Sequence, residues 1–307
     1  MIILANTIIH RFKDIIKIVG DFNDIEISGI SAIANAHENH LTWIHPKKPN
    51  KSEIILNTKS RLIITDESIE EEICKAYKKC LIVNSNPKLL FTEIANLFFS
   101  NQQKYEICAD THIHSDAKIS KEVYIGPNTI IGRATIGKNV RILGNVYISD
   151  NTYIGDNVTI SAGSVIGSEG FGYTRNIDGK FVNFPQIGGV IISDNVDIGP
   201  NSCIDRGALS DTIIEENTKI GHLVYIAHNS KIGKSNLLIA NIVISGSVTT
   251  GDEVYIAPGV VISDNISIGN NCFVGIGTIV TKSIRDNKRI LSRNIEIIEL
   301  DQHTFKK

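Results

Sequence analysis

The residue best suited to chemistry is His228, in the segment Ile226-Ala227-His228-Asn229, because an imidazole exchanges protons near neutral pH. Acyl transfer from a thioester to an amine needs such a general base, since the amine must lose a proton as its nitrogen attacks. The negative oxygen of the tetrahedral intermediate also needs hydrogen-bond donors, and backbone N–H groups at the turn Ser245-Gly246 are candidates. The alternative is a histidine that only hydrogen-bonds its own turn.

His228 follows one rung of a ladder in which aliphatic residues recur every six positions, from Ile113 to Val280. A typical unit reads Ile-Gly-x-x-(Thr/Val)-x, as at residues 125–130 (IGPNTI). We expect the aliphatic residue and the small residue four positions later to face inward, while Gly, Asp and Asn form the corners. One such unit cannot bury its apolar face alone, so the units must stack into a solenoid.

This repeat resembles that of the hexapeptide-repeat acyltransferases. The resemblance implies a mainly β fold, a left-handed parallel β-helix with three hexapeptides per coil and roughly eight coils. Neighbouring coils should lie about 4.8 Å apart, the ordinary separation of strands. We therefore expect three parts: a small α/β, nucleotide-binding-like domain at 1–107, the catalytic β-helix at 108–282 and a short C-terminal tail at 283–307.

The ladder is interrupted twice, and insertions in a solenoid form loops that often carry function. About 20 extra residues follow Ile166, and about four follow Ile204. With three units per coil, the rungs Ile166, Ile204, Ile226 and Ile244 fall on one face if the interruptions simply loop out. The corners after these four rungs, which include His228, are then expected to line one pocket.

The first 107 residues lack the ladder and show a mixed pattern. Short aliphatic runs at 54–56, 61–64 and 80–83 predict buried strands. Residues 87–99 (PKLLFTEIANLFF) have apolar residues at helical spacing, with a proline suited to the first helical turn. These elements predict a small α/β domain.

Four segments, in the same order, resemble the bacterial UDP-3-O-acylglucosamine N-acyltransferases of lipid A synthesis. They are GSEGFGY at 167–173, PQIG at 185–188, IDRGALSDT at 204–212 and IAHN at 226–229. The resemblance implies that His228 is the general base of an N-acyltransferase acting on a UDP-linked amino sugar, with UDP-3-O-acylglucosamine as the expected substrate. The residues expected at the substrate are Asp205, Arg206, Asn229, Phe171, Tyr173, Gln186 and Gly246 from the β-helix, and Trp43 and His45 from the N-terminal domain.

The same resemblance implies a homotrimer with active sites between subunits, and a 3-hydroxyacyl group on acyl carrier protein as the donor. The N-terminal domain would help to hold the uridine nucleotide, and Trp43 offers an aromatic face for stacking on a base. The segment Trp43–Lys48 departs from the family's nucleotide motif and lacks its tyrosine. Asp205 or Asp211 is expected to orient His228, and spacing does not decide between them.

Three departures from the family leave alternatives open. The family often has Asp-Asn where this chain has Gly221-His222, and Asn265 stands where a second family histidine is expected. The end of the ladder, residues 275–284, looks more like the coenzyme A-dependent sugar acetyltransferases of this fold. The alternative enzyme is therefore an acyl-coenzyme A-dependent N-acyltransferase acting on a nucleotide-linked amino sugar for O-antigen or capsule. A non-catalytic β-helical scaffold is the third hypothesis, and the interruptions gathered beside His228 argue against it.

Composition argues against several other classes of protein. The formal net charge of −2 over 307 residues gives no basic footprint for nucleic acid. No run of about 18 apolar residues predicts a transmembrane segment. The five cysteines include no CxxC pair, so we expect a reducing, cytoplasmic location and no structural zinc. His112 and His114 have no third ligand nearby, so we expect no metal, and no cofactor beyond the thioester donor.

Overall fold

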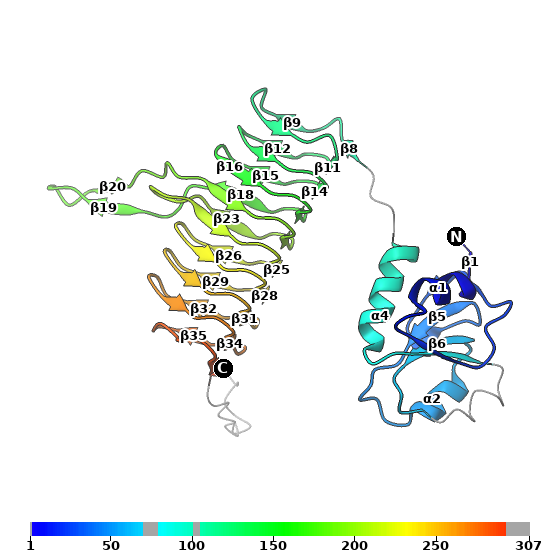
Figure 1. Ribbon diagram of the computed structural model, residues 1–307. Coiled ribbons are helices and arrows are strands. Elements are labelled where there is room, and N and C mark those ends of the chain that lie inside the picture. Colours follow the sequence, from blue (N-terminus) through cyan, green and yellow to red (C-terminus); the bar gives the residue numbers. More distant parts are fainter. Residues whose placement is uncertain (1, 70–78, 101–104, 293–307) are drawn as a thin grey trace, which may run out of the picture. The chain divides into compact units, whose positions relative to one another are not determined.

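The structure, a computed structural model, describes residues 2–69, 79–100 and 105–292. The chain divides into two compact units, Met1–Gln102 and Gln103–Lys307 (Figure 1). Each unit encloses its own buried aliphatic cluster, so each has its own core.

The first unit is a small α/β domain. Its described elements are β1 (Ile3–Leu4), α1 (Ala5–Phe12), β2 (Lys17–Val19), β3 (Glu26–Ile27), β4 (Gly29–Ile30), η1 (Ile33–Asn35), β5 (His40–Trp43), α2 (Lys51–Asn57), β6 (Leu62–Thr65), β7 (Cys80–Val83), α4 (Pro87–Ile94) and η2 (Ala95–Phe99). Five strands form one sheet in the order β2-β7-β6-β5-β4, and only β2 runs antiparallel to its neighbour. The expected strands at 61–64 and 80–83 and the helix from Pro87 are confirmed.

The expected strand at 54–56 is wrong, because these residues lie in helix α2. Ile55 is fully buried, whereas Ile54 and Leu56 are only half-buried. Burial on one face is what an amphipathic helix requires, and three consecutive aliphatic residues cannot by themselves distinguish a helix from a strand.

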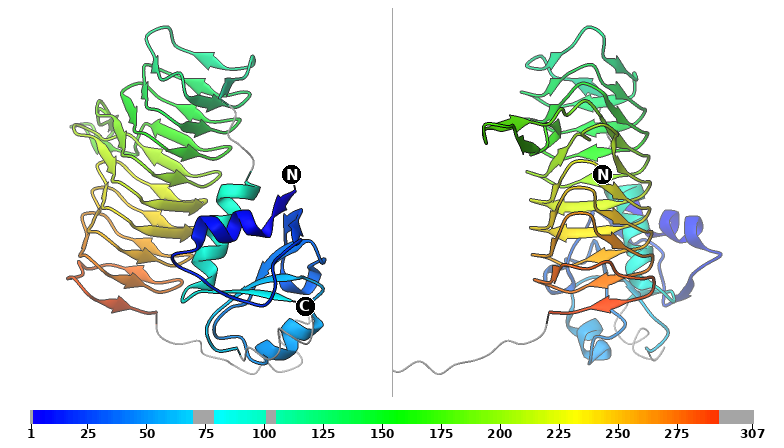
Figure 2. Two further views of the ribbon diagram at one scale, coloured as in Figure 1. Left: turned by 45° about the vertical axis from the view of Figure 1, so that its right-hand side comes forward. Right: turned by 90° about the vertical axis from the view of Figure 1, so that its left-hand side faces the viewer.

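The second unit is a parallel β-helix in which the coils contribute strands to three sheets (Figures 1 and 2). We name each sheet after one of its strands. The β25 sheet contains β8 (Glu106–Ile107), β11 (Val123–Ile125), β14 (Val140–Ile142), β17 (Thr159–Ile160), β22 (Asp197–Ile198), β25 (Lys219–His222), β28 (Leu237–Ala240), β31 (Tyr255–Ile256), β34 (Phe273–Val274) and β36 (Arg289–Ile290).

The other two sheets complete the coils. The β26 sheet contains β9 (His112–Ile113), β12 (Ile130–Ile131), β15 (Tyr147–Ile148), β18 (Val165–Ser168), β23 (Cys203–Asp205), β26 (Tyr225–Ile226), β29 (Val243–Ile244), β32 (Val261–Ile262) and β35 (Ile279–Val280). The β27 sheet contains β10 (Lys118–Ile119), β13 (Thr135–Ile136), β16 (Thr152–Ile154), β21 (Val190–Ile192), β24 (Thr212–Ile214), β27 (Lys231–Ile232), β30 (Thr249–Thr250) and β33 (Ser267–Ile268). The expected mainly β fold of stacked hexapeptide units is confirmed.

The ladder residues stack directly on one another. Ile166 is paired with Ile204, Ile204 with Ile226, and Ile226 with Ile244, so these four rungs do share one sheet. Their side chains are buried in the continuous core of the β-helix. Both interruptions therefore loop out without changing the count of three, and the corners after these rungs lie along one edge.

The β-helix extends slightly beyond both expected ends. Residues 106–107 pair with β11. At the other end β36 pairs with β34, and Ile284 forms a bridge with Ile268. These last pairings join residues sixteen apart, whereas Ile226 and Ile244 are eighteen apart, so a shortened coil breaks the period and conceals the final rungs. Of the expected tail 283–307, residues 293–307 lie outside the described part of the chain.

One rung of the ladder is polar, and a buried partner explains it. Thr250 Oγ1 accepts hydrogen bonds from Asn236 Nδ2 at 2.7 Å and from the backbone N–H of Gly233 at 3.1 Å. Asn236 is fully buried, and its Oδ1 accepts from the N–H of Val254 at 2.6 Å. The threonine thus satisfies an amide group inside an otherwise aliphatic core.

We expect Thr250→Val to lower the free energy of unfolding of the β-helix by about 1–3 kcal/mol, because it leaves a buried N–H of Asn236 without an acceptor. Urea denaturation followed by circular dichroism measures this difference. Thr249→Val is the matched control, since Thr249 is exposed on the other side of the same strand. Equal stability of the two variants would contradict the role assigned to Thr250.

Candidate active site

His228 lies between two glycines, Gly170 on the long loop that follows Ile166 and Gly246 on the next coil. A Cβ added at Gly170 would come within 2.8 Å of Cβ and 2.9 Å of Nδ1 of His228. A Cβ added at Gly246 would come within 2.8 Å of both Cε1 and Nε2. The half-buried imidazole therefore presents Nδ1 to the long loop and Nε2 to the Gly246 corner, and only glycine leaves room for it on both sides.

The long loop after Ile166 reaches out and then returns to this histidine. Its strands β19 (Tyr173–Arg175) and β20 (Phe181–Asn183) form an antiparallel hairpin that projects from the stack of coils (Figures 1 and 2). Phe171 is 81% exposed and Tyr173 is also exposed, whereas Gln186 on the returning arm is only 8% exposed. The same loop thus supplies exposed aromatic rings and one buried amide.

The bulge after Ile204 is fastened to both the loop and the histidine corner. Asn229 Oδ1 accepts a hydrogen bond from the N–H of Ala208 at 2.8 Å. The N–H groups of Ile187 and Gly188 donate to the carbonyl of Ala208 at 2.7 and 3.1 Å. Arg206 donates from Nε to the carbonyl of Gly188 at 2.8 Å. These bonds hold the loop, the bulge and the His228 corner as one assembly.

Neither expected carboxylate is hydrogen-bonded to His228. Asp205 is buried and accepts from Ser168 Oγ at 2.7 Å and from Tyr225 Oη at 2.6 Å. Burial and the hydrogen bond to this carboxylate raise the pKa of Tyr225, so the phenol keeps the proton it donates. Asp211 accepts from the N–H of Gly189 at 2.7 Å. Both carboxylates brace the surrounding loops rather than the imidazole.

The structure brings together the expected residues His228, Asn229, Gln186, Gly246, Asp205 and Arg206 along one edge of the β-helix. Phe171 and Tyr173 lie on the long loop that also carries Gln186. Sequence reasoning did not identify Gly170, Ser168 or Tyr225 as parts of this assembly. Gly170 and Ser168 lie within the GSEGFGY segment. Tyr225 directly precedes a ladder residue, which places it on the outer face of its strand.

Trp43 and His45 belong to the first unit. The Trp43 ring lies 6.2 Å from the ring of Phe91 and packs against that unit's core, and it is half-buried. His45 is exposed, and its Nδ1 accepts from the N–H of Lys47 at 3.1 Å. Their assigned contact with a uridine base remains a prediction.

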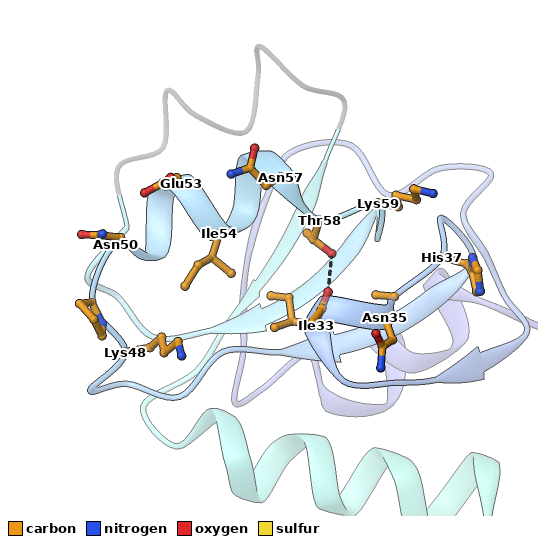
Figure 3. A pocket seen from close by; sticks show the side chains of 13 residues that line it. Ile33, Asn35, His37, Lys48, Asn50, Glu53, Ile54, Asn57, Thr58 and Lys59 are labelled. Carbon is orange, nitrogen blue, oxygen red and sulfur yellow. Dashed lines mark hydrogen bonds between the residues drawn. The ribbon is translucent and has the colours of Figure 1, made fainter.

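The first unit also has a cavity of about 710 Å³ that the sequence did not predict and that neither Trp43 nor His45 lines (Figure 3). Ile33 and Ile54 contribute apolar surface, and Lys48 and Lys59 lie at opposite ends of it in Figure 3. Thr58 Oγ1 donates to the carbonyl of Ile33 at 3.1 Å and fastens the two sides together.

The outer face of the β26 sheet carries a mainly apolar column beside the site. The residue just before each ladder residue points outward, because side chains alternate along a strand. The column consists of His112, Ile130, Tyr147, Val165, Cys203, Tyr225, Val243, Val261 and Ile279. The corresponding positions of the other two sheets include charged residues such as Arg141, Asp197 and Lys231.

Within 2–69, 79–100 and 105–292, no three or more His, Cys, Asp or Glu side chains gather closely enough to hold a metal ion. No helix in this part of the chain is long and apolar enough to cross a membrane.

Comparison with known proteins agrees with the hexapeptide repeat. Residues 133–168 match the family described as bacterial transferase hexapeptide (six repeats). A UDP-3-O-acylglucosamine N-acyltransferase of Helicobacter pylori (strain ATCC 700392 / 26695) is 36% identical over 96 residues, which are 31% of this chain and 29% of that protein. The enzyme of the same name from Caulobacter vibrioides (strain NA1000 / CB15N) is 44% identical over 88 residues, 29% of this chain and 26% of that protein. The chain thus matches less than a third of the length of these relatives.

Solved structures share the fold over a longer stretch. The UDP-N-acetylglucosamine acyltransferase of Francisella novicida matches with a TM-score of 0.53 and 27% identity, over 58% of this chain and 63% of that one. The UDP-N-acetylglucosamine acyltransferase of Bacteroides fragilis 9343 matches with a TM-score of 0.54 and 26% identity, over 62% and 71%. The chain therefore resembles the hexapeptide-repeat acyltransferases in fold, and the UDP-3-O-acylglucosamine N-acyltransferases in sequence over part of its length.

Proposed function

We propose that this protein is an N-acyltransferase that moves a 3-hydroxyacyl group from a thioester to the amine of UDP-3-O-acylglucosamine in lipid A synthesis. The observation that carries the proposal is the placement of His228, with Nε2 beside a corner that has no side chain. The names of the relatives that match about 30% of this chain support the choice of substrate.

The chemistry needs one base and one oxyanion donor. His228 Nε2 takes the proton of the sugar amine while the nitrogen attacks the thioester carbonyl. The backbone N–H of Gly246 makes no hydrogen bond to another described residue, so it is free to donate to the tetrahedral oxygen. The C–S bond then breaks, and the imidazolium returns its proton to the departing thiolate. The products are an amide and a free thiol.

The proposal includes a homotrimer whose active sites lie between subunits. Exposed apolar surface next to a site favours burial against another chain. The column on the β26 sheet and the aromatic residues of the β19–β20 hairpin both provide such surface beside His228. A neighbouring subunit covering this face would close the pocket and exclude water. The reducing cytoplasm is the proposed compartment, consistent with a free thiol at Cys203.

We expect Val261→Glu to dissociate the trimer, because it places a charge within the apolar column, between Val243 and Ile279. Native mass spectrometry measures the result. The matched control is Ser267→Glu, which places the same charge on the outer face of the β27 sheet. If Val261→Glu remained a trimer, the apolar column would not be part of the subunit interface.

The identity of both substrates is tested by offering the full-length chain two donors and two acceptors and identifying the product by mass spectrometry. The donors are a 3-hydroxyacyl thioester of acyl carrier protein and a short acyl-coenzyme A. The acceptors are UDP-3-O-acylglucosamine and an unacylated UDP-amino sugar. We expect the amide only from the carrier-protein thioester and the 3-O-acylated sugar. Turnover restricted to acyl-coenzyme A and the unacylated sugar would instead support the O-antigen or capsule enzyme.

A further inference from the structure

Two buried polar atoms at the site, one on His228 and one on Gln186, have no hydrogen-bond partner among the described residues. Among the described residues, neither His228 Nδ1 nor Gln186 Oε1 makes a hydrogen bond, although both are buried. A Cβ built on Gly170 would lie 2.9 Å from Nδ1 and 3.0 Å from Oε1. The two atoms therefore border one small space, which exists because residue 170 is a glycine.

The orientation of the Gln186 amide is fixed by its other end. Nε2 donates a hydrogen bond to the carbonyl of Phe184 at 3.3 Å. If the amide were flipped, Oε1 would face that carbonyl, and Oε1 has no proton to donate. A Cβ at Gly172 would come within 2.9 Å of the same Nε2. The amide thus lies between two glycines of the loop, with its oxygen toward the histidine. Gln186 is 8% exposed, so water at the surface does not readily satisfy that oxygen.

We infer that Gln186 is a positioning residue, whose Oε1 accepts a hydrogen bond directly from Nδ1–H of His228 and so keeps Nε2 unprotonated. This inference rests on the proposed function in assigning Nε2 the task of base. The hydrogen bond itself follows from the two facing atoms, because an amide oxygen can only accept and must therefore be matched with a protonated Nδ1.

A neutral amide suits this position during proton transfer. When Nε2 takes the proton of the amine, the ring becomes an imidazolium in which Nδ1–H is still a donor, so the bond to Gln186 persists through the step. The amide neither gains nor loses a proton. It holds the ring plane and tautomer, while the proton moves only between the amine, Nε2 and the departing thiolate.

The charged groups near the His228 corner have hydrogen-bond partners of their own, are exposed, or lie on the next corner of the same edge. Asp205 and Asp211 accept the hydrogen bonds described above, and Arg206 donates to backbone carbonyls. Glu169 on the loop is exposed, and Asp264 on the corner beyond Gly246 accepts from its neighbour Asn265. Gln186, on the long loop that packs against His228, is thus the group that faces Nδ1.

The decisive test is the tautomer of His228, read from its ring ¹⁵N chemical shifts in the full-length chain. The spectrum of His228→Ala identifies the signals. We expect the wild-type ring to carry its proton on Nδ1, and Gln186→Leu to move a large fraction of it to Nε2. In the same variant kcat should fall roughly 10- to 100-fold, because a misplaced base costs about that much, while KM changes little. Asn183→Leu, an exposed amide of the same loop, is the control and should leave the shifts unchanged.

A second variant keeps the test informative if Gln186→Leu does not fold. Gln186→Glu retains an acceptor but adds a charge that favours the imidazolium. It should preserve the Nδ1–H tautomer and move both the ¹⁵N titration midpoint of His228 and the acidic limb of kcat/KM to higher pH. An unmoved midpoint in Gln186→Glu, or a wild-type ¹⁵N pattern in folded Gln186→Leu, would overturn the inference. Because the ¹⁵N reading needs no substrate, it stands apart from the acyl-transfer assay, whose failure alone would overturn only the proposed function.

Discussion

Replacing His228 by alanine is expected to lower kcat by about 10²- to 10⁴-fold, since the step then lacks its general base. The fold should persist, because the side chain is half-buried at a corner and leaves the aliphatic core intact. Steady-state acyl transfer measures kcat, and circular dichroism checks the fold. The matched control is His222→Ala, an exposed histidine at the end of strand β25, which should keep near-normal activity. If the two alanine variants turned over equally, His228 would lose its assigned role.

The second large effect is expected from Gly246→Ala, with a fall in kcat of about 10²-fold. Its methyl group would lie 2.8 Å from Nε2 and Cε1 of His228, so it would displace the ring or occupy the space that the amine must enter. Gly246 has no positive φ, so alanine suits its backbone and the substitution acts on the site.

The control for Gly246→Ala is another crowded corner glycine. A Cβ at Gly275 would lie 2.7 Å from Leu291 Cδ2, the flexible end of a side chain that can move aside, and 3.1 Å from the carbonyl oxygen of Ile290. Gly275→Ala should therefore keep its activity. A fully active Gly246→Ala would show that the amine approaches His228 from elsewhere.

The spacing of the ladder predicted much of the β-helix, because the burial of one aliphatic side chain per rung is a local requirement that repeats along the chain. Each rung must bury one aliphatic side chain, so a fixed period of six follows from the stacking itself. The same count placed Ile166, Ile204, Ile226 and Ile244 on one sheet, as the pairings confirm. The prediction failed where the period changes, at the shortened coil that ends with β36.

The site was only partly predictable. His228 could be selected because its imidazole stands at a corner on the same edge as the two interruptions, directly after them in the stack of coils. The partners of its two nitrogens could not be found from spacing, since Gly170 and Gln186 belong to a loop that leaves the ladder and returns by its own hydrogen bonds. Asp205 was a plausible partner for the histidine by stacking. The hydroxyl groups of Ser168 and Tyr225 engage it instead, because they lie on strands that pair with its own.

The most direct measurement is single-turnover amide formation by His228→Ala, with and without added imidazole. The truncated side chain leaves a space between Gly170 and Gly246 that has the shape of an imidazole ring. We predict almost no amide from UDP-3-O-acylglucosamine without imidazole, and a partial return that increases with its concentration. A rate close to that of the wild-type chain without imidazole, or no return with imidazole while the sugar nucleotide still binds, would contradict the assignment of His228 as the base.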